Sequence, residues 1–370
     1  MTKRIGILTA GNDCPGLNAA IRAIGKAART GHGMEMIAFQ DGFQGLVNNH
    51  VIQPALSGIL TTGGTILGTS RDTPEKMATN GKTSDQTAKA IATYREHNLD
   101  ALICIGGLET QEGAYHLMQQ GINVITLPKG IDNDLSETDQ TIGFDTALGT
   151  ATDAIDRLHS TASSHHRVIV VEIMGRNTGW LTLGSGIAGG ADVIIIPEIP
   201  YDVRKICEAI FERTRSGKRF SIIAVSEGAV SIDMVEFFER SKRVNRMNRS
   251  GEDQEEVERK LSKIENNLTG STIYLANRLK AFTNLDTRIT ILGHLLRGGT
   301  PSAADRVLAT NLGTISVRLA QEGVFGVMVA KLGNKTVPVP LEKVIGRHKL
   351  VSPDHPWIEN ARSVGTHLGD

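Results

Sequence analysis

The feature that most constrains the fold of this chain is a series of short, uninterrupted apolar runs separated by segments with helical periodicity. The runs cover residues 5–9, 101–105, 123–127, 168–172, 193–196, 221–225 and 327–330. Continuous hydrophobicity of this kind is typical of parallel strands that are covered on both faces. Helices between the runs imply right-handed βαβ crossovers. The sequence therefore predicts an α/β chain with doubly wound, mostly parallel sheets.

Polar segments that contain glycine follow most of the predicted strands, at residues 10–13, 106–110, 128–134, 174–176 and 226–228. In doubly wound folds, ligands bind at the carboxyl ends of the strands, where loops lead into helix N-termini. One such loop indicates only a tight turn, but several favour a phosphate or nucleotide site. A dehydrogenase is disfavoured, because no GxGxxG follows the first strand and no acid is placed about 20 residues later to hold a ribose.

The charge balance limits the classes of partner. The 370 residues include 40 Lys+Arg and 40 Asp+Glu, so the formal net charge is zero, and the length favours two domains. Three cysteines without CxxC spacing favour a reducing compartment. We see no signal-peptide pattern and no apolar run that approaches the roughly 18 residues of a membrane span. We expect a soluble, cytoplasmic protein without a nucleic-acid or membrane partner, in which local arginines hold any anion.

The most specific signal lies at residues 128–134, which read PKGIDND. This segment resembles PKTIDND, the catalytic loop of the 6-phosphofructokinase family. Other segments resemble further motifs of this family and occur in the family's order along the chain. They are residues 11–18 (GNDCPGLN), 63–71, 153–158, 174–176, 187–191 and 288–301, the last containing LGHLLRGG. The pattern is most similar to the pyrophosphate-dependent or mixed-donor members of the family.

The resemblance implies two doubly wound domains with the active site in the cleft between them. We expect residues 1–135 to form a larger, donor-binding domain, with 300–370 packing onto or near it. Residues 136–300 would form a smaller domain that binds the sugar phosphate. Within it, residues 239–269 are dense in charge and carry an apolar stripe at Val257, Leu261, Ile264 and Leu268, which predicts a helical insertion. A solvated helix packed by one face is favoured there over an effector-binding or subunit-contacting segment.

The resemblance also assigns the acceptor side of the site. Asp132 is expected to be the base for the 1-hydroxyl of fructose 6-phosphate and Asp134 to assist it, with Lys129 and Arg176 completing the catalytic set. The expected sugar-phosphate ligands are Gly130, Arg167, Met174, Gly175, Arg176, Glu227, Arg288, His294 and Arg297. Arginine suits this task because its planar fork of donors matches phosphate. Arg167 and Arg288 are implied to reach in from a neighbouring subunit of a homodimer or homotetramer.

The donor side is expected to be held by loop backbone and a few side chains, with Mg²⁺ as the cofactor. The residues concerned are Gly11, Asn12, Arg71, Gly107, Glu109, Thr110 and Lys129. If the position of Asn12, where the family has a second glycine, requires a positive φ, asparagine is the mildest replacement. Arg71 would face the donor phosphates.

Three departures from the family pattern bear on the reaction. Leu108 stands where an acid organises magnesium, and its side chain cannot bind a hard cation, which requires oxygen. Either the metal is held more loosely, or the adjacent Glu109 replaces the missing ligand, or catalysis is impaired. Glu109 stands where ATP users have glycine, and Lys129 is typical of pyrophosphate users. Gly130 replaces a threonine whose hydroxyl would touch the phosphate or sugar, and the loss of such a hydrogen bond costs ~0.5–1.5 kcal/mol.

We therefore expect transfer of a phosphoryl group from pyrophosphate to fructose 6-phosphate, giving fructose 1,6-bisphosphate. An ATP-dependent 6-phosphofructokinase is the first alternative. A catalytically impaired sugar-phosphate-binding paralogue is the second, because Leu108 and Gly130 replace expected catalytic residues. A different acceptor, such as a seven-carbon ketose phosphate, also remains open because specificity depends on pocket shape.

Overall fold

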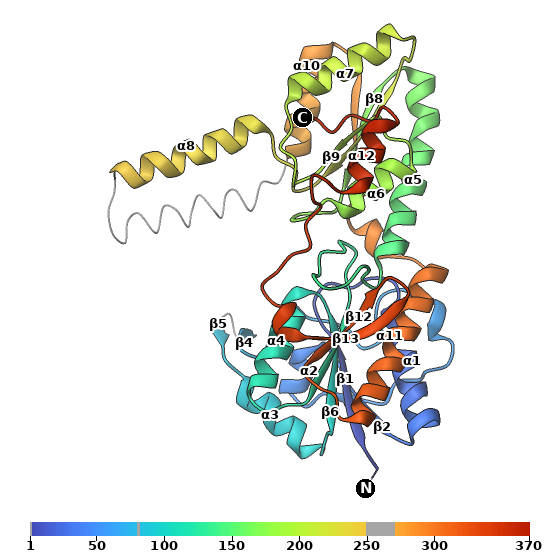
Figure 1. The fold of residues 1–370 in the computed structure, drawn as a ribbon, viewed down its shortest axis with the longest axis vertical. Coiled ribbons are helices and arrows are strands. Elements are labelled where there is room, and N and C mark those ends of the chain that lie inside the picture. Colours follow the sequence, from blue (N-terminus) through green and yellow to red (C-terminus); the bar gives the residue numbers. More distant parts are fainter. Residues whose placement is uncertain (1, 80–81, 249–270) are drawn as a thin grey trace. The chain divides into compact units, whose positions relative to one another are not determined.

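The fold is known from a computed structural model that describes residues 2–79, 82–248 and 271–370, with the side chains of 242–248 not described (Figure 1). The chain divides into two compact units. The first comprises Met1–Ala147 and His294–Lys349, and the second comprises Leu148–Gly293 and Leu350–Asp370.

In the described part of the first unit, one sheet has seven strands in the order β13-β12-β7-β6-β1-β2-β3. The strands are β1 (Arg4–Thr9), β2 (Glu35–Phe39), β3 (Val51–Ile52), β6 (Ala101–Gly106), β7 (Val124–Pro128), β12 (Val327–Leu332) and β13 (Lys335–Pro340). Only β3 and β13, the two edge strands, pair antiparallel to their neighbours. The central strand β6 is buried throughout, which explains its uninterrupted apolar run.

Helices cover both faces of this sheet. They are α1 (Leu17–Lys26), α2 (Phe43–Val47), α3 (Thr87–Glu96), α4 (Leu108–Gln119) and α11 (Ala303–Glu322), with short helices η1 (Ala27–Gly31), η2 (Ile59–Thr61), η3 (Gly293–Arg297) and η4 (Leu341–Lys343). Figure 1 shows α1 and α11 together on one face, and the core between the sheet and α2, α3 and α4 occupies the other. A small hairpin, β4 (Met77–Thr79) and β5 (Lys82–Ser84), completes the unit.

The described residues of the second unit form a four-stranded parallel sheet in the order β11-β8-β10-β9. Its strands are β8 (Val168–Ile173), β9 (Val193–Ile195), β10 (Ser221–Ser226) and β11 (Thr287–Ile291). The helices are α5 (Phe144–His165), α6 (Trp180–Ala188), α7 (Val203–Arg215), α8 (Ile232–Asn248), α10 (Ser271–Thr283) and α12 (Pro356–Ser363). Apolar residues of α7 and α10 form one core with the strands, while α6 contacts β9 and β10.

The predicted fold class is confirmed, since both sheets are mostly parallel and carry helices. The predicted helical insertion at 239–269 falls largely outside the described residues, so its apolar stripe lies there too. Only its first part is described, where α8 extends to Asn248. Within the described ranges, no helix is long and apolar enough to span a membrane.

The chain's last residues do not follow the expected division. Residues 294–349 belong to the first unit, but 350–370 pack on the second, whereas we expected all of 300–370 on or near the first. The rings of His355 and Trp357 lie edge-on to Trp180, with centroids 4.8 Å and 6.0 Å from it. The backbone of His367 accepts a hydrogen bond from Ile194 N at 2.9 Å beside β9. Aromatic burial and strand pairing therefore hold this segment to the second unit.

Candidate active site

Three of the predicted loops meet in the first unit. They follow β1, β6 and β7, which are neighbours in the sheet and run parallel, so their carboxyl ends lie at one edge. This is the position at which doubly wound sheets bind ligands.

The loop after β1 is fastened to residues 69–71. Gly11 has a φ of +81°, donates its N–H to the Ser70 carbonyl at 2.8 Å and accepts from the Thr69 hydroxyl at 2.6 Å. Arg71 donates from Nε to Asn12 Oδ1 at 2.8 Å. Asn12 does not have a positive φ, so of these two adjacent positions only Gly11 is left-handed, and no strain arises from the replacement. The loop geometry expected of two glycines is thus achieved by one.

Lys129 joins the loop after β7 to the loop after β1. The residue is only 3 % exposed, and its Nζ donates to the carbonyl oxygen of Asn12. A Cβ at Gly11 would lie 3.3 Å from this Nζ, so the missing side chain leaves the amine facing the first loop. Burial lowers the pKa of Lys129, while the nearby acids Asp13 and Asp132 oppose that change. Asp132 is therefore electrostatically coupled to Lys129.

The acidic part of this loop is held around Asn133, which has a φ of +53° and is 5 % exposed. Its Nδ2 donates to the Asp139 carbonyl at 3.1 Å, and its Oδ1 accepts from Thr141 N at 3.0 Å. Asp132 and Asp134 flank this anchor and are both partly exposed. The loop therefore presents two carboxylates from a fixed backbone, which is what a positioned general base requires.

Gly130, the replacement for threonine, precedes these acids with a φ of +159°, a value that residues with a side chain rarely adopt. A Cβ there would meet only Asp134 Oδ1, at 4.0 Å. Its carbonyl accepts a hydrogen bond from the Thr141 hydroxyl. The space for a larger side chain therefore exists.

Two residues at this loop escaped the sequence analysis. His348 Nδ1 lies 3.4 Å from Asp134 Oδ2, and this contact raises the pKa of the histidine. Lys349 donates its backbone N–H to the Asp134 carbonyl at 2.8 Å and its Nζ to the carbonyls of Thr138 and Asp139 at 2.8 Å and 3.0 Å. Burial lowers the pKa of Lys349 to about 8. No local signal could have found them, because more than 200 residues separate them from the loop.

The loop after β6 leads into α4 through Gly107. Leu108, the first residue of the helix, is partly buried and packs against the apolar core between the sheet and α2, α3 and α4. Glu109 follows in the first turn and is exposed, while Thr110 is 2 % exposed. An acid in the first helical turn is favourable because the helix dipole is positive there. Leu108 thus has a packing role that the motif comparison did not reveal.

The side chains at this site could bind Mg²⁺ only together with phosphate oxygens of a substrate. In the part of the chain that the structure describes, no group of three or more His, Cys, Asp or Glu residues could hold a metal ion. Mg²⁺ is usually bound by one or two carboxylates together with substrate phosphates. The exposed carboxylate of Glu109 fits that arrangement, whereas Leu108 contributes no oxygen.

Arg297 and His294 lie on η3 and belong to the first unit. Arg297 donates from Nη1 to the Asp13 carbonyl at 3.3 Å, which places it beside the loop after β1. His294 is exposed.

In the second unit, Met174, Gly175 and Arg176 follow β8, and Glu227 follows the adjacent strand β10. Glu227 N donates to the Ile173 carbonyl at 2.9 Å, and Gly228 N donates to the Gly175 carbonyl at 3.2 Å. The structure therefore brings these four predicted residues together at the carboxyl end of the sheet.

Arg167 and Arg288 lie at the other end of that sheet. Arg167 directly precedes β8, and Arg288 is the second residue of β11, paired with Ile169. Met174 lies seven positions after Arg167, at the far end of the strand, or roughly 23 Å away at about 3.3 Å per residue. The two arginines are therefore not brought together with Arg176 and Glu227.

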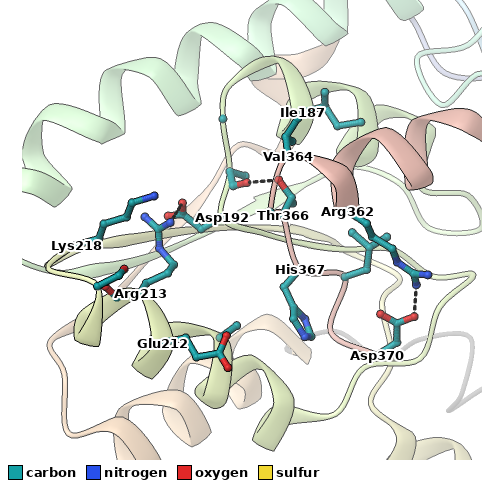
Figure 2. A pocket seen from close by; sticks show the side chains of 16 residues that line it. Ile187, Asp192, Glu212, Arg213, Lys218, Arg362, Val364, Thr366, His367 and Asp370 are labelled. Atoms are coloured by element: carbon teal, nitrogen blue, oxygen red, sulfur yellow. Dashed lines mark hydrogen bonds and ion pairs between the residues drawn. The ribbon is translucent and has the colours of Figure 1, made fainter.

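A separate hollow of 960 Å³ lies in the second unit between α7 and the C-terminal segment (Figure 2). Two ion pairs form between residues that line it: Arg213 Nη1 lies 2.7 Å from Asp192 Oδ1, and Arg362 pairs with Asp370. Figure 2 also shows Thr366, whose hydroxyl donates to the Ala191 carbonyl at 3.2 Å. No residue predicted for catalysis is among the described residues that line this hollow.

Comparison with known proteins gives a match over most of the chain. The family model described as "Phosphofructokinase" matches residues 4–320. An "ATP-dependent 6-phosphofructokinase" of Propionibacterium freudenreichii subsp. shermanii is 52 % identical over 373 residues, covering 100 % of both chains. A protein of the same name from Spirochaeta thermophila is 45 % identical over 380 residues, covering 100 % of this chain and 98 % of its own.

Among solved structures, a pyrophosphate-dependent phosphofructokinase from Marinobacter aquaeolei is similar with a TM-score of 0.78 and 21 % identity. The match covers 99 % of this chain and 88 % of that one, and at this identity it concerns the fold alone. The more similar relatives carry the name ATP-dependent, so they favour the first alternative of the sequence analysis over pyrophosphate.

Proposed function

The chain belongs to the phosphofructokinase family, and we propose that it transfers the γ-phosphoryl group of ATP to the 1-hydroxyl of fructose 6-phosphate. The observation that carries the proposal is the joining of the two loops by Lys129. Asp132 lies on the same loop as Lys129, and the buried amine of Lys129 faces the loop after β1. A base for the acceptor and a positive charge for the donor phosphates are what phosphoryl transfer requires of a protein.

In the proposed reaction, the Asp132 carboxylate takes the proton of the 1-hydroxyl as that oxygen bonds to the γ-phosphorus. The bond from the γ-phosphorus to the β–γ bridging oxygen breaks, and ADP leaves with the electron pair. Lys129 offsets negative charge on the donor phosphates, and Gly11 lets them approach the backbone. Arg176 acts on the transferring phosphate, and Asp134 orients the acceptor.

The sugar phosphate would be recognised by Met174, Gly175, Arg176 and Glu227, together with Arg167, Arg288, His294 and Arg297. Because Arg167 and Arg288 occupy the opposite end of their sheet, we propose that they serve the site of another copy in a homo-oligomer. Mg²⁺, when bound with the donor, would neutralise phosphate charge beside Glu109.

Pyrophosphate is the second candidate donor, and Glu109 is the observation that favours it. Its side chain adds bulk and negative charge at the first turn of α4, where the α-phosphate of ATP would lie. The argument from Lys129 is weaker than the sequence suggested, because its Nζ binds the Asn12 carbonyl and so has a loop-joining role with either donor.

A coupled assay for fructose 1,6-bisphosphate, with each donor offered separately, tests the proposal. We expect efficient turnover with ATP and at least about tenfold less with pyrophosphate. Product from pyrophosphate but not from ATP would overturn the donor assignment. Fructose 6-phosphate binding by calorimetry, without turnover from either donor in Mg²⁺ or Mn²⁺, would instead support the impaired paralogue. Offering a seven-carbon ketose phosphate in the same assay tests the acceptor.

Two variants make this assay specific for the site. Asp132→Asn should lower kcat by about 10²–10⁴-fold, the usual contribution of a general base, without altering the melting temperature. Glu109→Gly removes the side chain that crowds the α-phosphate, so it should raise the ATP-to-pyrophosphate ratio of kcat/KM. An unchanged ratio would mean that Glu109 does not influence donor choice.

A further inference from the structure

One carboxylate contacts both arginines at the amino end of the second sheet. Asp286 Oδ2 accepts from Arg167 Nε at 2.6 Å, and Asp286 Oδ1 lies 3.2 Å from Arg288 Nη2. Nothing in the sequence analysis singled out this residue, which has no place among the predicted ligands.

The backbone fixes where this carboxylate stands. Asp286 immediately precedes β11, and its carbonyl accepts the N–H of Val168, the first residue of β8, at 3.1 Å. Thr287 is in register with Val168, and Arg288 with Ile169. Asp286 therefore sits between the two arginines because of strand pairing, not because of a flexible surface contact.

Arg167 and Arg288 lie where a phosphate could reach them without entering the site at the carboxyl end of their own sheet. β11 is the edge strand of the sheet, and Arg288 is 59 % exposed at its side chain, against 27 % for Arg167. The contact through Nε of Arg167 and one Nη of Arg288 leaves further N–H groups of each guanidinium for another oxyanion.

Two physical effects favour a carboxylate between the arginines: the repulsion between their charges and the entropy of their side chains. Two guanidiniums that converge on one anion repel each other, and a carboxylate between them offsets that repulsion. Arginine side chains also lose much rotamer freedom when they bind, and a prior contact removes part of that loss. Its hydrogen bond with Arg167 lowers the pKa of Asp286, so the carboxylate stays ionised at neutral pH.

We propose that Asp286 is a positioning residue that holds Arg167 and Arg288 as one phosphate-binding pair for fructose 6-phosphate bound to a second copy of the chain. This inference rests on the proposed function. It differs from masking, in which Asp286 would compete with the phosphate for the arginines and weaken binding.

The test compares Asp286→Ala and Asp286→Glu with a matched control, Asp153→Ala. Asp153 pairs with Arg157 on α5 of the same unit, through Nε at 2.8 Å, but that pair lies outside the proposed site. Asp286→Ala should raise the KM for fructose 6-phosphate about tenfold, with kcat and the donor KM within about twofold. Asp286→Glu should recover most of that loss, and Asp153→Ala should behave like the unaltered chain. Melting temperature and oligomeric mass, measured alongside, should not change.

An unchanged KM in Asp286→Ala overturns the inference, and a lowered KM establishes masking in its place. Calorimetric binding of fructose 6-phosphate distinguishes a failure of this inference from a failure of the proposed function. If the unaltered chain binds the sugar without turnover, the Kd of Asp286→Ala decides the inference by the same tenfold criterion. If the unaltered chain neither binds nor converts fructose 6-phosphate, the proposed function fails and this inference fails with it.

Discussion

Lys129 Nζ donates a hydrogen bond to the carbonyl oxygen of Asn12, and this bond ties the loop after β7 to the loop after β1. The residue is buried, since only 3 % of it is exposed. A buried amine is costly unless a nearby anion uses its charge, which agrees with phosphate beside Gly11.

The first prediction concerns the charge of Lys129. Lys129→Met keeps the length of the side chain but removes the amine, so we expect kcat to fall by about tenfold or more, since a hydrogen bond to a charged group is worth ~1.5–3 kcal/mol. Because burial lowers the pKa of Lys129, activity of the unaltered chain should decline as pH rises through that lowered pKa, below the ordinary 10.5. Steady-state rates across pH measure both effects. A variant with full activity would exclude a role for the charge.

The second prediction concerns His348 and Asp134. The contact raises the pKa of His348 above 6.5, so the charged pair is fully present below pH 6.5 and is lost as pH rises through the folded pKa. The imidazolium faces Asp134 and, at longer range, Glu112 on α4. Under the proposed function, it would offset carboxylate charge near the transferred phosphate. We therefore expect the kcat/KM ratio of the unaltered chain to His348→Gln to be highest at low pH and to decline above pH 6.5.

Arg347→Gln is the control for this comparison, because it changes an exposed neighbour in the same segment. Its pH profile should follow that of the unaltered chain. A pH-independent ratio for His348→Gln would assign the histidine a structural role only. The side chain is 37 % exposed, so we expect little change in melting temperature.

Much of the fold could be predicted from continuous apolar runs, because buried parallel strands leave that pattern in the sequence. The runs at 101–105 and 221–225 fall within β6 and β10, and the glycine-bearing loops follow them. The pattern could not assign residues 350–370, whose attachment depends on Trp357 meeting Trp180 and on pairing beside β9. Such contacts between distant segments have no local periodicity.

The candidate site was predictable where motifs carry it, but not where tertiary contacts do. Gly11 lies close to the Lys129 amine, and Asp132 acts electrostatically on Lys129, while the roles of all three remain predictions. Leu108 was interpreted only as a lost metal ligand, yet the structure shows it packed against a core. His348 and Asp286 contact predicted site residues through chain pairings that a motif comparison cannot reveal.

The third prediction concerns Gly130. Gly130→Thr would restore the hydroxyl that the family pattern expects, and its Cβ would meet only Asp134 Oδ1 at 4.0 Å. The φ of +159° is one that residues with a Cβ rarely adopt, so both Gly130→Thr and the control must strain or turn this backbone by a similar amount. A regained hydrogen bond of ~0.5–1.5 kcal/mol should make the kcat of Gly130→Thr roughly two- to tenfold higher than that of Gly130→Val. Gly130→Val, which has the shape without the hydroxyl, is the control. Equal rates in the two variants would attribute any gain to a stiffer loop.

The last prediction concerns Asp305, which links residues 143–146, at the start of α5, to α11. The side chain is fully buried and accepts from Gly143 N at 2.9 Å, Thr146 N at 2.8 Å and the Thr146 hydroxyl at 2.5 Å. Ser302 caps α11 by accepting from Asp305 N at 3.1 Å, and its own N–H donates to the Thr146 hydroxyl at 2.9 Å. Each of the two helix starts, of α5 and of α11, thus supplies acceptors for N–H groups of the other that have no acceptor within their own helix.

Asp305→Ala would leave the two N–H groups of Gly143 and Thr146 buried without acceptors. At ~1–3 kcal/mol for each such group, we expect the free energy of unfolding to fall by about 2–6 kcal/mol. Urea denaturation monitors this loss, and Asp156→Ala, an exposed change on α5, should stay within ~0.5 kcal/mol of the unaltered chain. Because Asp305 touches no proposed substrate, the folded fraction should keep its KM for fructose 6-phosphate. A stable variant with a raised KM would instead show that Asp305 acts on the substrate site, contrary to its contacts.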